Sequence, residues 1–371
     1  MSRMERFWRR VTDGMELSQL WNQFRVDARS SYRLYSHKVD STRTPGTGKG
    51  RHFLNVGVQF FWAIIEKLSP ARRVLLLIAL LLLVFNGGIS WQNAHGELRV
   101  FEFDGAMWGA LVLLLLVILE VADRVVMKRD LQIAKEIQEW LLPATPPTVP
   151  GLEIAFATRA ANTVAGDYYD VFPRPSSLPD ETFLIAIADV AGKSIPAGLL
   201  MATFQASLKT LAGTSATLTE LVGRMNAYAC SNSQNGRRFT TTFIAEYHSA
   251  THNLTYVNSG HNPPILRRNT GAMERLNDGG IPLGILADAP YQSATVTLQS
   301  GDWLVIFTDG VTEAENESAE EYGETRLLNI LYVNAALTPA LMLQTMMRDL
   351  DLYVGDAPQH DDVTLVLLKA V

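Results

Sequence analysis

Residues 187–193, Ile187-Ala188-Asp189-Val190-Ala191-Gly192-Lys193, place an aspartate where an apolar run meets a glycine turn. The run before it, Phe183–Ala188, has the length and composition of a buried β-strand. A carboxylate at the end of a buried strand is costly unless a partner offsets its desolvation. Divalent cations such as Mg²⁺ and Mn²⁺ are suitable partners because they prefer oxygen ligands.

The same design recurs three times, in Gly166-Asp167-Tyr168-Tyr169-Asp170, Phe307-Thr308-Asp309-Gly310 and His360-Asp361-Asp362-Val363-Thr364. Strand-like runs adjoin two of these stretches, because Trp303–Phe307 precedes Asp309 and Val363–Leu368 follows Asp362. One such aspartate alone could simply cap a helix or fix an Asx turn. Four of them, far apart in the sequence and alike in local design, predict a shared binuclear metal site.

The residues of these motifs and their order along the chain resemble those of the PPM family of metal-dependent serine/threonine phosphatases, in its SpoIIE/RsbU branch. The resemblance runs from about residue 131 to residue 368 and includes the helix Leu131–Pro143, Asn258-Ser259-Gly260-His261-Asn262-Pro263-Pro264, Gly280-Ile281-Pro282-Leu283-Gly284 and Thr308-Asp309-Gly310-Val311-Thr312-Glu313-Ala314. The chain departs from the family pattern at three positions. Ala165 and Ser194 stand where the family usually has glycine, and Ser259 where it often has alanine.

The resemblance implies an αββα sandwich for residues 144–371, whereas the residues alone support only the α+β class. It also implies a ligand set for two Mn²⁺ or Mg²⁺ ions. Asp189 would bridge both ions, with the Val190 carbonyl supporting one; Asp167 would serve one ion, and Asp309 and Asp361 the other. Asp362 is the second choice within its pair.

Periodicity predicts the elements of this domain. The expected strands are 183–188, 241–247, 253–257, 265–268, 294–298, 303–307 and 363–368, and the expected helices are 195–211, 218–231, 324–335 and 339–353.

Four other residues are weaker site candidates. Asp170 is expected to be structural or to support Asp167, and Lys193 to meet substrate or an acid. His261 is expected to hydrogen-bond within a turn, and Glu313 to fix the turn after Asp309. The single cysteine, Cys230, excludes an internal disulfide and suits a small helix position.

Two apolar runs predict a transmembrane hairpin in residues 71–123, with spans at about 74–91 and 105–122. Fourteen Lys/Arg against six Asp/Glu in residues 1–73 make the cytoplasmic N-terminal segment 1–70 basic, and residues 124, 128 and 129 are basic as well. This pattern predicts a multi-pass protein of the cytoplasmic membrane with both termini in the cytoplasm. The basic segment favours anionic lipid over nucleic acid.

A linker helix is predicted for residues 124–143, with Val126, Ile133, Ile137 and Trp140 at helical spacing and Leu141 joining them. This apolar stripe could pack on its own domain or pair with a second copy as a short coiled coil.

The sequence thus predicts a membrane-anchored phosphatase that acts on phosphoserine or phosphothreonine. By analogy, its substrate would be a phosphorylated STAS-domain anti-sigma-factor antagonist in a partner-switching pathway. The alternative is a catalytically silent membrane-bound module with the same fold. A nucleic-acid partner is not expected, because residues 74–371 are strongly acidic.

Overall fold

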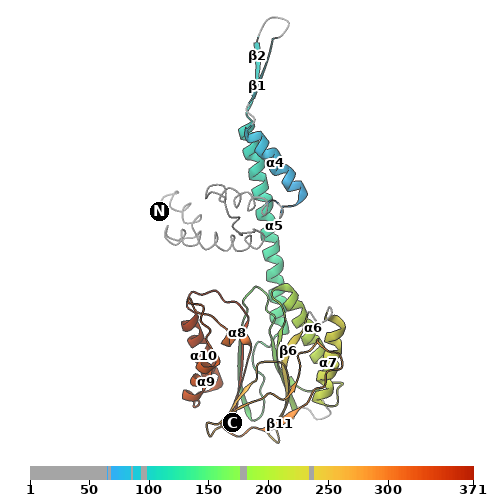
Figure 1. The fold of residues 1–371 in the computed structure, drawn as a ribbon, viewed down its shortest axis with the longest axis vertical. Coiled ribbons are helices and arrows are strands. Elements are labelled where there is room, and N and C mark those ends of the chain that lie inside the picture. Colours follow the sequence, from blue (N-terminus) through green and yellow to red (C-terminus); the bar gives the residue numbers. More distant parts are fainter. Residues whose placement is uncertain (1–64, 66–67, 85–86, 93–97, 176–181, 234–237) are drawn as a thin grey trace, which may run out of the picture. The chain divides into compact units, whose positions relative to one another are not determined.

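The computed structural model describes residues 65, 68–84, 87–92, 98–175, 182–233 and 238–371 (Figure 1). These residues belong to two compact units, Met1–Val125 and Val126–Val371. The basic segment predicted for residues 1–70 lies almost entirely outside the described residues. The second unit carries all four aspartate motifs.

The described part of the first unit consists of a helix, a β-hairpin and the start of a second helix. These elements are α4 (Pro70–Val84), β1 (Gly87–Gln92), β2 (Leu98–Phe103) and α5 (Gly105–Leu141). Arg72 of α4 forms ion pairs of 3.1 and 2.7 Å with Glu120 and Asp123 of α5. A Cβ atom at Gly109 would lie 2.9 Å from the carbonyl oxygen of Ala79, so the two helices pack closely there.

The structure does not support the predicted transmembrane hairpin. Helix α4 ends at Val84 and strand β1 begins at Gly87, so the first predicted span, residues 74–91, is wrong in its second half. The 15 residues of α4 span about 22 Å at ~1.5 Å per residue, whereas a bilayer core is about 30 Å thick. The second predicted span, residues 105–122, lies within α5. Within the part of the chain that the structure describes, no helix is both long and apolar enough to cross a membrane.

The predicted linker helix is the last part of α5 rather than a separate element. α5 runs without interruption from Gly105 to Leu141 and ends two residues before Pro143. Proline at that position has no backbone N–H to continue the helical hydrogen bonds.

The second unit contains two stacked β-sheets with helices on both outer faces (Figure 1). The first sheet has the order β10-β7-β6-β5-β4, with β11 also paired to β7, and the second has the order β3-β13-β12-β8-β9. All pairs are antiparallel except β10 with β7. The strands are β3 (Leu152–Arg159), β4 (Tyr168–Pro173), β5 (Thr182–Val190), β6 (Thr240–His248), β7 (Asn253–Ser259), β8 (Ile265–Arg267), β9 (Met273–Arg275), β10 (Gly279–Gly280), β11 (Ala294–Thr297), β12 (Trp303–Phe307) and β13 (Val363–Ala370).

The helices pair on the two faces. Figure 1 shows α6 and α7 on one side of the sheets, and α9 and α10 on the other. The helices are α6 (Ile195–Ala212), α7 (Leu218–Asn232), α8 (Asp309–Thr312), α9 (Glu324–Val333) and α10 (Pro339–Val354).

Three apolar clusters hold these four layers together. Between the sheets, Ile185 and Phe243 of the first sheet share a cluster with Leu304 and Val366 of the second. Alternate residues of the first sheet instead pack with α6 and α7, and alternate residues of the second pack with α9 and α10. This arrangement follows from the two-residue side-chain period of a strand. It confirms the predicted αββα sandwich.

Candidate active site

The four predicted aspartates come together at one end of the sandwich. Asp189 lies near the end of β5, Asp167 directly before β4, Asp309 at the start of α8 after β12, and Asp361 two residues before β13. Antiparallel pairing explains the convergence, because β4 begins opposite the end of β5, and β13 begins beside the end of β12. Four chain segments therefore deliver carboxylates to the same edge of the two sheets.

The electrostatics show that these carboxylates influence one another. Burial, together with the charges of Asp309, Asp361 and Asp362, raises the pKa of Asp189 to about 7. Burial also raises the pKa of Asp167 well above its ordinary value, and the charge of Asp189 is the second cause of this rise. Burial and then Asp361 raise the pKa of Asp309. Desolvation and like charge both disfavour ionised carboxylates, so the cluster requires compensating positive charge.

Asp167 is held by two threonine hydroxyls. Thr308 and Thr364 both donate to its Oδ2 atom, at 2.9 and 2.5 Å. The Thr308 hydroxyl also accepts a 3.0 Å hydrogen bond from the backbone N–H of Thr364. Both threonines are fully buried, so the orientation of Asp167 is fixed from the adjoining sheet.

The two neighbouring aspartates, Asp361 and Asp362, have different surroundings. The Asp362 Oδ1 and Oδ2 atoms accept backbone hydrogen bonds from Ala161 and Gly166, at 2.7 and 2.6 Å. Asp362 thus organises the loop that leads to Asp167. The side chain of Asp361 is 44% exposed, and its Oδ2 atom lies 3.0 Å from the Lys193 ammonium. This geometry favours Asp361 over Asp362 as a ligand.

Asp170 belongs to a separate network. Its Oδ2 atom accepts a 2.9 Å hydrogen bond from the Tyr168 hydroxyl and lies 2.6 Å from the Lys209 ammonium of α6. The Lys209 ammonium also lies 3.4 Å from the centre of the Phe172 ring. Asp170 therefore ties β4 to α6, which agrees with a structural role.

The turn after Asp189 has an unusual backbone. Gly192 has φ +125°, and Ser194 has φ 64° and ψ −146°. Few residues other than glycine adopt that region, so Ser194 carries backbone strain. Close to Asp362, a Cβ atom at Gly310 would lie 2.1 Å from the Asp362 carbonyl oxygen. Glycine at 310 therefore allows α8 to approach the strand that follows Asp362.

Sequence reasoning missed Gln138, which connects α5 to the Asp167 loop. The Gln138 side chain donates to the Ala165 carbonyl at 2.7 Å and accepts from the Ala165 N–H at 2.9 Å. Both residues are buried. Gln138 lies four and seven positions after Ala134 and Leu131, which are partly buried, so helical spacing could have indicated it.

His261 and Glu313 lie near the site in different ways. The His261 side chain is buried, and its Nδ1 atom lies 3.2 Å from the Thr241 hydroxyl. Burial lowers the pKa of His261 to about 4, so the imidazole is neutral at neutral pH. This favours the structural role expected for it. Burial and the charge of Asp309 raise the pKa of Glu313.

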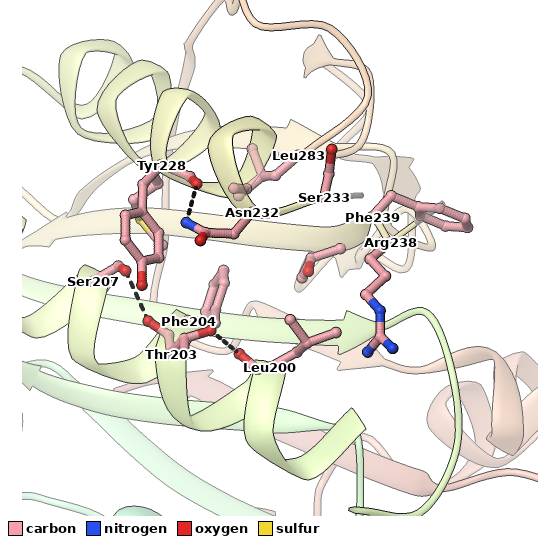
Figure 2. A pocket seen from close by; sticks show the side chains of 13 residues that line it. Leu200, Thr203, Phe204, Ser207, Tyr228, Asn232, Ser233, Arg238, Phe239 and Leu283 are labelled. Atoms are coloured by element: carbon pink, nitrogen blue, oxygen red, sulfur yellow. Dashed lines mark hydrogen bonds between the residues drawn. The ribbon is translucent and has the colours of Figure 1, made fainter. Parts of the chain in front are cut away.

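A cavity of about 180 Å³ opens beside the carboxylates. Arg159, Lys193, Gly310, Glu313 and Asp361 are among the residues that line it. A second, apolar cavity of about 40 Å³ lies between α6, α7 and the start of β6 (Figure 2). None of the clustered aspartates lines the second cavity.

The residues present suit hard divalent cations. The clustered donors are carboxylate oxygens, which Mg²⁺ and Mn²⁺ prefer, and the raised pKa values indicate excess negative charge. Within the described ranges, however, no group of three or more His, Cys, Asp or Glu side chains is already arranged to hold a metal ion.

Two curated relatives share this part of the chain. The protein IcfG of Synechocystis sp. is 26% identical over an alignment of 263 residues, and the match covers 64% of this chain and 41% of IcfG. The phosphoserine phosphatase RsbU of Bacillus subtilis is 30% identical over 243 residues, which are 65% of this chain and 70% of RsbU. The chain thus spans less than half of IcfG and somewhat more than two thirds of RsbU.

The fold also has solved counterparts. The SiaA-PP2C domain of Pseudomonas aeruginosa superposes with a TM-score of 0.58 at 19% identity, over 67% of this chain and 99% of that domain. The family model described as Stage II sporulation protein E matches residues 179–371, just over half of the sequence. Together with the likeness to RsbU, this match shows that the chain belongs to the SpoIIE family of PP2C-type phosphatase domains.

Proposed function

We propose that this chain is a metal-dependent phosphatase that hydrolyses phosphoserine or phosphothreonine on a protein. The observation that carries the proposal is the convergence of Asp167, Asp189, Asp309 and Asp361 from four chain segments. The likeness to RsbU, which is named a phosphoserine phosphatase, supports this substrate class. A catalytically silent module would have no evident need for a cluster of buried carboxylates with raised pKa values.

The proposed metal ligands rest on the family resemblance, and the proposed supporting roles rest on hydrogen bonds in the structure. Asp189 and the Val190 carbonyl, with Asp167, Asp309 and Asp361, would hold two Mn²⁺ or Mg²⁺ ions. When bound, such ions activate water and neutralise phosphoryl oxygens. Other side chains position these ligands. Thr308 and Thr364 orient Asp167 through hydrogen bonds to its carboxylate. Asp362 fixes the loop before Asp167 through backbone hydrogen bonds.

The proposed substrate is a phosphorylated regulatory protein of a partner-switching pathway. A STAS-domain anti-sigma-factor antagonist is the specific proposal, and it rests on the family resemblance. A folded phosphoprotein would have direct access to the site, because Asp361 and Lys193 are about half exposed beside the 180 Å³ cavity.

The last part of α5 is proposed to pair with a second copy of the chain. Within this helix, Ile133, Ile137 and Trp140 are 44%, 48% and 81% exposed, whereas Gln138 faces the sandwich. About half or more of each of these side chains is exposed, and an apolar helix face of this kind suits a coiled-coil partner. Because Gln138 lies on the same helix, pairing could influence the Asp167 loop.

The dimer proposal has a direct test in the full-length protein. Replacing Ile133 and Ile137 by glutamine should lower the mass measured by sedimentation, because it removes apolar surface from the pairing face. Leu352→Gln is a suitable control, since Leu352 is 74% exposed on α10. Equal mass for the double variant and the control would contradict pairing through α5.

Attachment to the cytoplasmic side of a membrane stays a proposal. It is supported by the exposed apolar side chains of α4 and early α5, which include Leu77, Leu81 and Leu114. Basic residues before α4 would favour anionic lipid. Sedimentation of the full-length protein with and without phosphatidylglycerol vesicles tests the proposal, and recovery only in the supernatant would contradict it.

The catalytic proposal is tested with purified full-length protein, Mn²⁺ and a phosphoserine peptide. Release of phosphate that ceases on addition of a chelator supports the enzyme. Binding of the phosphopeptide without any turnover at saturating Mn²⁺ would favour the silent module.

A further inference from the structure

We propose that Lys193 is a tethered cation that competes with a divalent cation for Asp361. The inference rests on the proposed function, in which Asp361 holds one of the two ions. It adds a residue that sets how tightly this chain binds metal.

The ammonium group of Lys193 sits directly on the proposed ligand. Its Nζ atom lies 3.0 Å from Asp361 Oδ2 and donates a 2.7 Å hydrogen bond to the His360 carbonyl. Lys193 follows Gly192, whose φ of +125° turns the chain back after β5. The turn after Asp189 thus places the positive charge of Lys193 beside Asp361, which lies 172 residues after Asp189 in the chain.

The charge of Lys193 also acts on three other carboxylates near Asp361. It lowers the pKa of Asp189, Asp309 and Glu313, against the raising effect of burial. Among the main influences on the pKa of Asp189 and of Asp309, Lys193 is the one Lys or Arg of the described chain. Lys193 is therefore the main counter-charge that the described protein itself offers to Asp189 and Asp309.

This ion pair is built to be exchanged. The side chains of Lys193 and Asp361 are 56% and 44% exposed, and exposed pairs are weakly held. The pair between Lys209 and Asp170 is a contrast within the same chain. Asp170 is only 7% exposed, and Tyr168 holds the same carboxylate oxygen. Lys209 is thus a fixed partner, whereas Lys193 can swing away.

The Lys193 ammonium competes with a divalent cation for two reasons: it occupies an oxygen of Asp361, and it carries a charge of the same sign as the cation. A divalent cation on Asp361 would need oxygen lone pairs, and one of these oxygens now receives the ammonium. An ammonium that stays nearby also repels the incoming cation. Removing the positive charge while keeping the length of the side chain should therefore strengthen metal binding.

The test is calorimetric titration of Mn²⁺ into three variants of the full-length protein. Lys193→Met should tighten binding about tenfold, the scale expected for a partly screened charge a few ångströms away. Lys193→Arg keeps the charge and should stay within about twofold of the parent. Lys135→Met is the matched control, since Lys135 is 46% exposed and its partner is Glu139 of the same helix. The control should leave the affinity unchanged.

A second readout is thermal unfolding with and without Mn²⁺. The rise in Tm on adding Mn²⁺ should be larger for Lys193→Met than for the parent, because a ligand stabilises the folded state according to its affinity. Equal or weaker Mn²⁺ binding by Lys193→Met overturns the proposal, as does an equal gain in the Lys135→Met control. Neither readout requires hydrolysis, so failed turnover with tighter Mn²⁺ binding would contradict only the proposed function.

Discussion

The clasp between Gln138 and Ala165 gives the most specific prediction about stability. The side-chain amide of Gln138 satisfies both the N–H and the C=O of Ala165, at 2.9 and 2.7 Å. Gln138→Leu keeps the size of the side chain and removes both hydrogen bonds. The backbone groups of Ala165 are then left without these partners, in a residue that is only 4% exposed.

The expected cost follows from the two buried groups. Each buried donor or acceptor left unsatisfied costs about 1–3 kcal/mol. Burial of the leucine side chain offsets part of this cost by about 1–2 kcal/mol. Two such groups cost about 2–6 kcal/mol, so we expect Gln138→Leu to lower the free energy of unfolding by about 1–4 kcal/mol in total.

The assay is urea unfolding of the metal-free protein, combined with amide hydrogen exchange. Exchange at Ala165 and Gly166 should become faster, because these amides belong to the loop that the clasp holds. Gln132→Leu is the control, since Gln132 lies exposed on the same helix. If Gln138→Leu and Gln132→Leu unfold within about 0.5 kcal/mol of each other and exchange alike, the clasp contributes nothing.

Three further predictions concern the turn and the carboxylates. Ser194→Gly should raise the free energy of unfolding by about 1 kcal/mol in urea, because it relieves strain at φ 64°; a loss of stability would contradict this. The metal-free protein should lose stability as pH rises from about 4 to about 7, because burial gives Asp189 a folded-state pKa of about 7 and the native state retains its proton longer. Thermal unfolding across that range should show a smaller slope for Asp189→Asn, and an unchanged slope would refute the assignment. Asp362→Asn should lower the unfolding free energy by about 1–3 kcal/mol, because its NH2 group cannot accept one of the two backbone hydrogen bonds. Asp361→Asn should abolish turnover and leave stability nearly unchanged; the reverse ranking in urea unfolding and phosphate release would show that the two roles are exchanged.

Apolar runs in the sequence predict those strands of the sandwich that are buried on both faces. Strand β12 was placed correctly at Trp303–Phe307, because an unbroken apolar run between turn signals has few other interpretations. Strands β3 and β4 were missed. In β4, Tyr168–Pro173, an aspartate interrupts the apolar pattern because it pairs with Lys209 of a distant helix. Such a partner cannot be seen in local sequence.

The first unit shows the opposite error. The first predicted span runs from Val74 through Gly87 and Gly88 to Trp91, because hydropathy alone does not distinguish a helix from a strand. The structure ends the helix at Val84 and forms a β-hairpin from Gly87. Two adjacent glycines, with low helix propensity, were the available signal.

The candidate site was also only partly visible in the sequence. The aspartates could be found because each follows or precedes a strand. The residues that orient them could not, since Thr364 meets Asp167 across 197 positions of the chain. Gln138 was not predicted to be buried, because the apolar residues Ile133, Ile137 and Trp140 beside it indicated a different helix face. The structure shows that these three residues are exposed and that Gln138 is buried.

The most direct measurement of the central claim is phosphate release from a phosphoserine peptide by full-length protein and its Asp189→Asn variant. The parent should turn over the peptide with Mn²⁺ and stop when a chelator is added. Asp189→Asn should stay folded by circular dichroism and release no phosphate at saturating Mn²⁺, because it removes one negative charge from the cluster that includes Asp309 and Asp361. Undiminished turnover by Asp189→Asn, or by the parent in excess chelator, would contradict a metal-dependent site at these carboxylates.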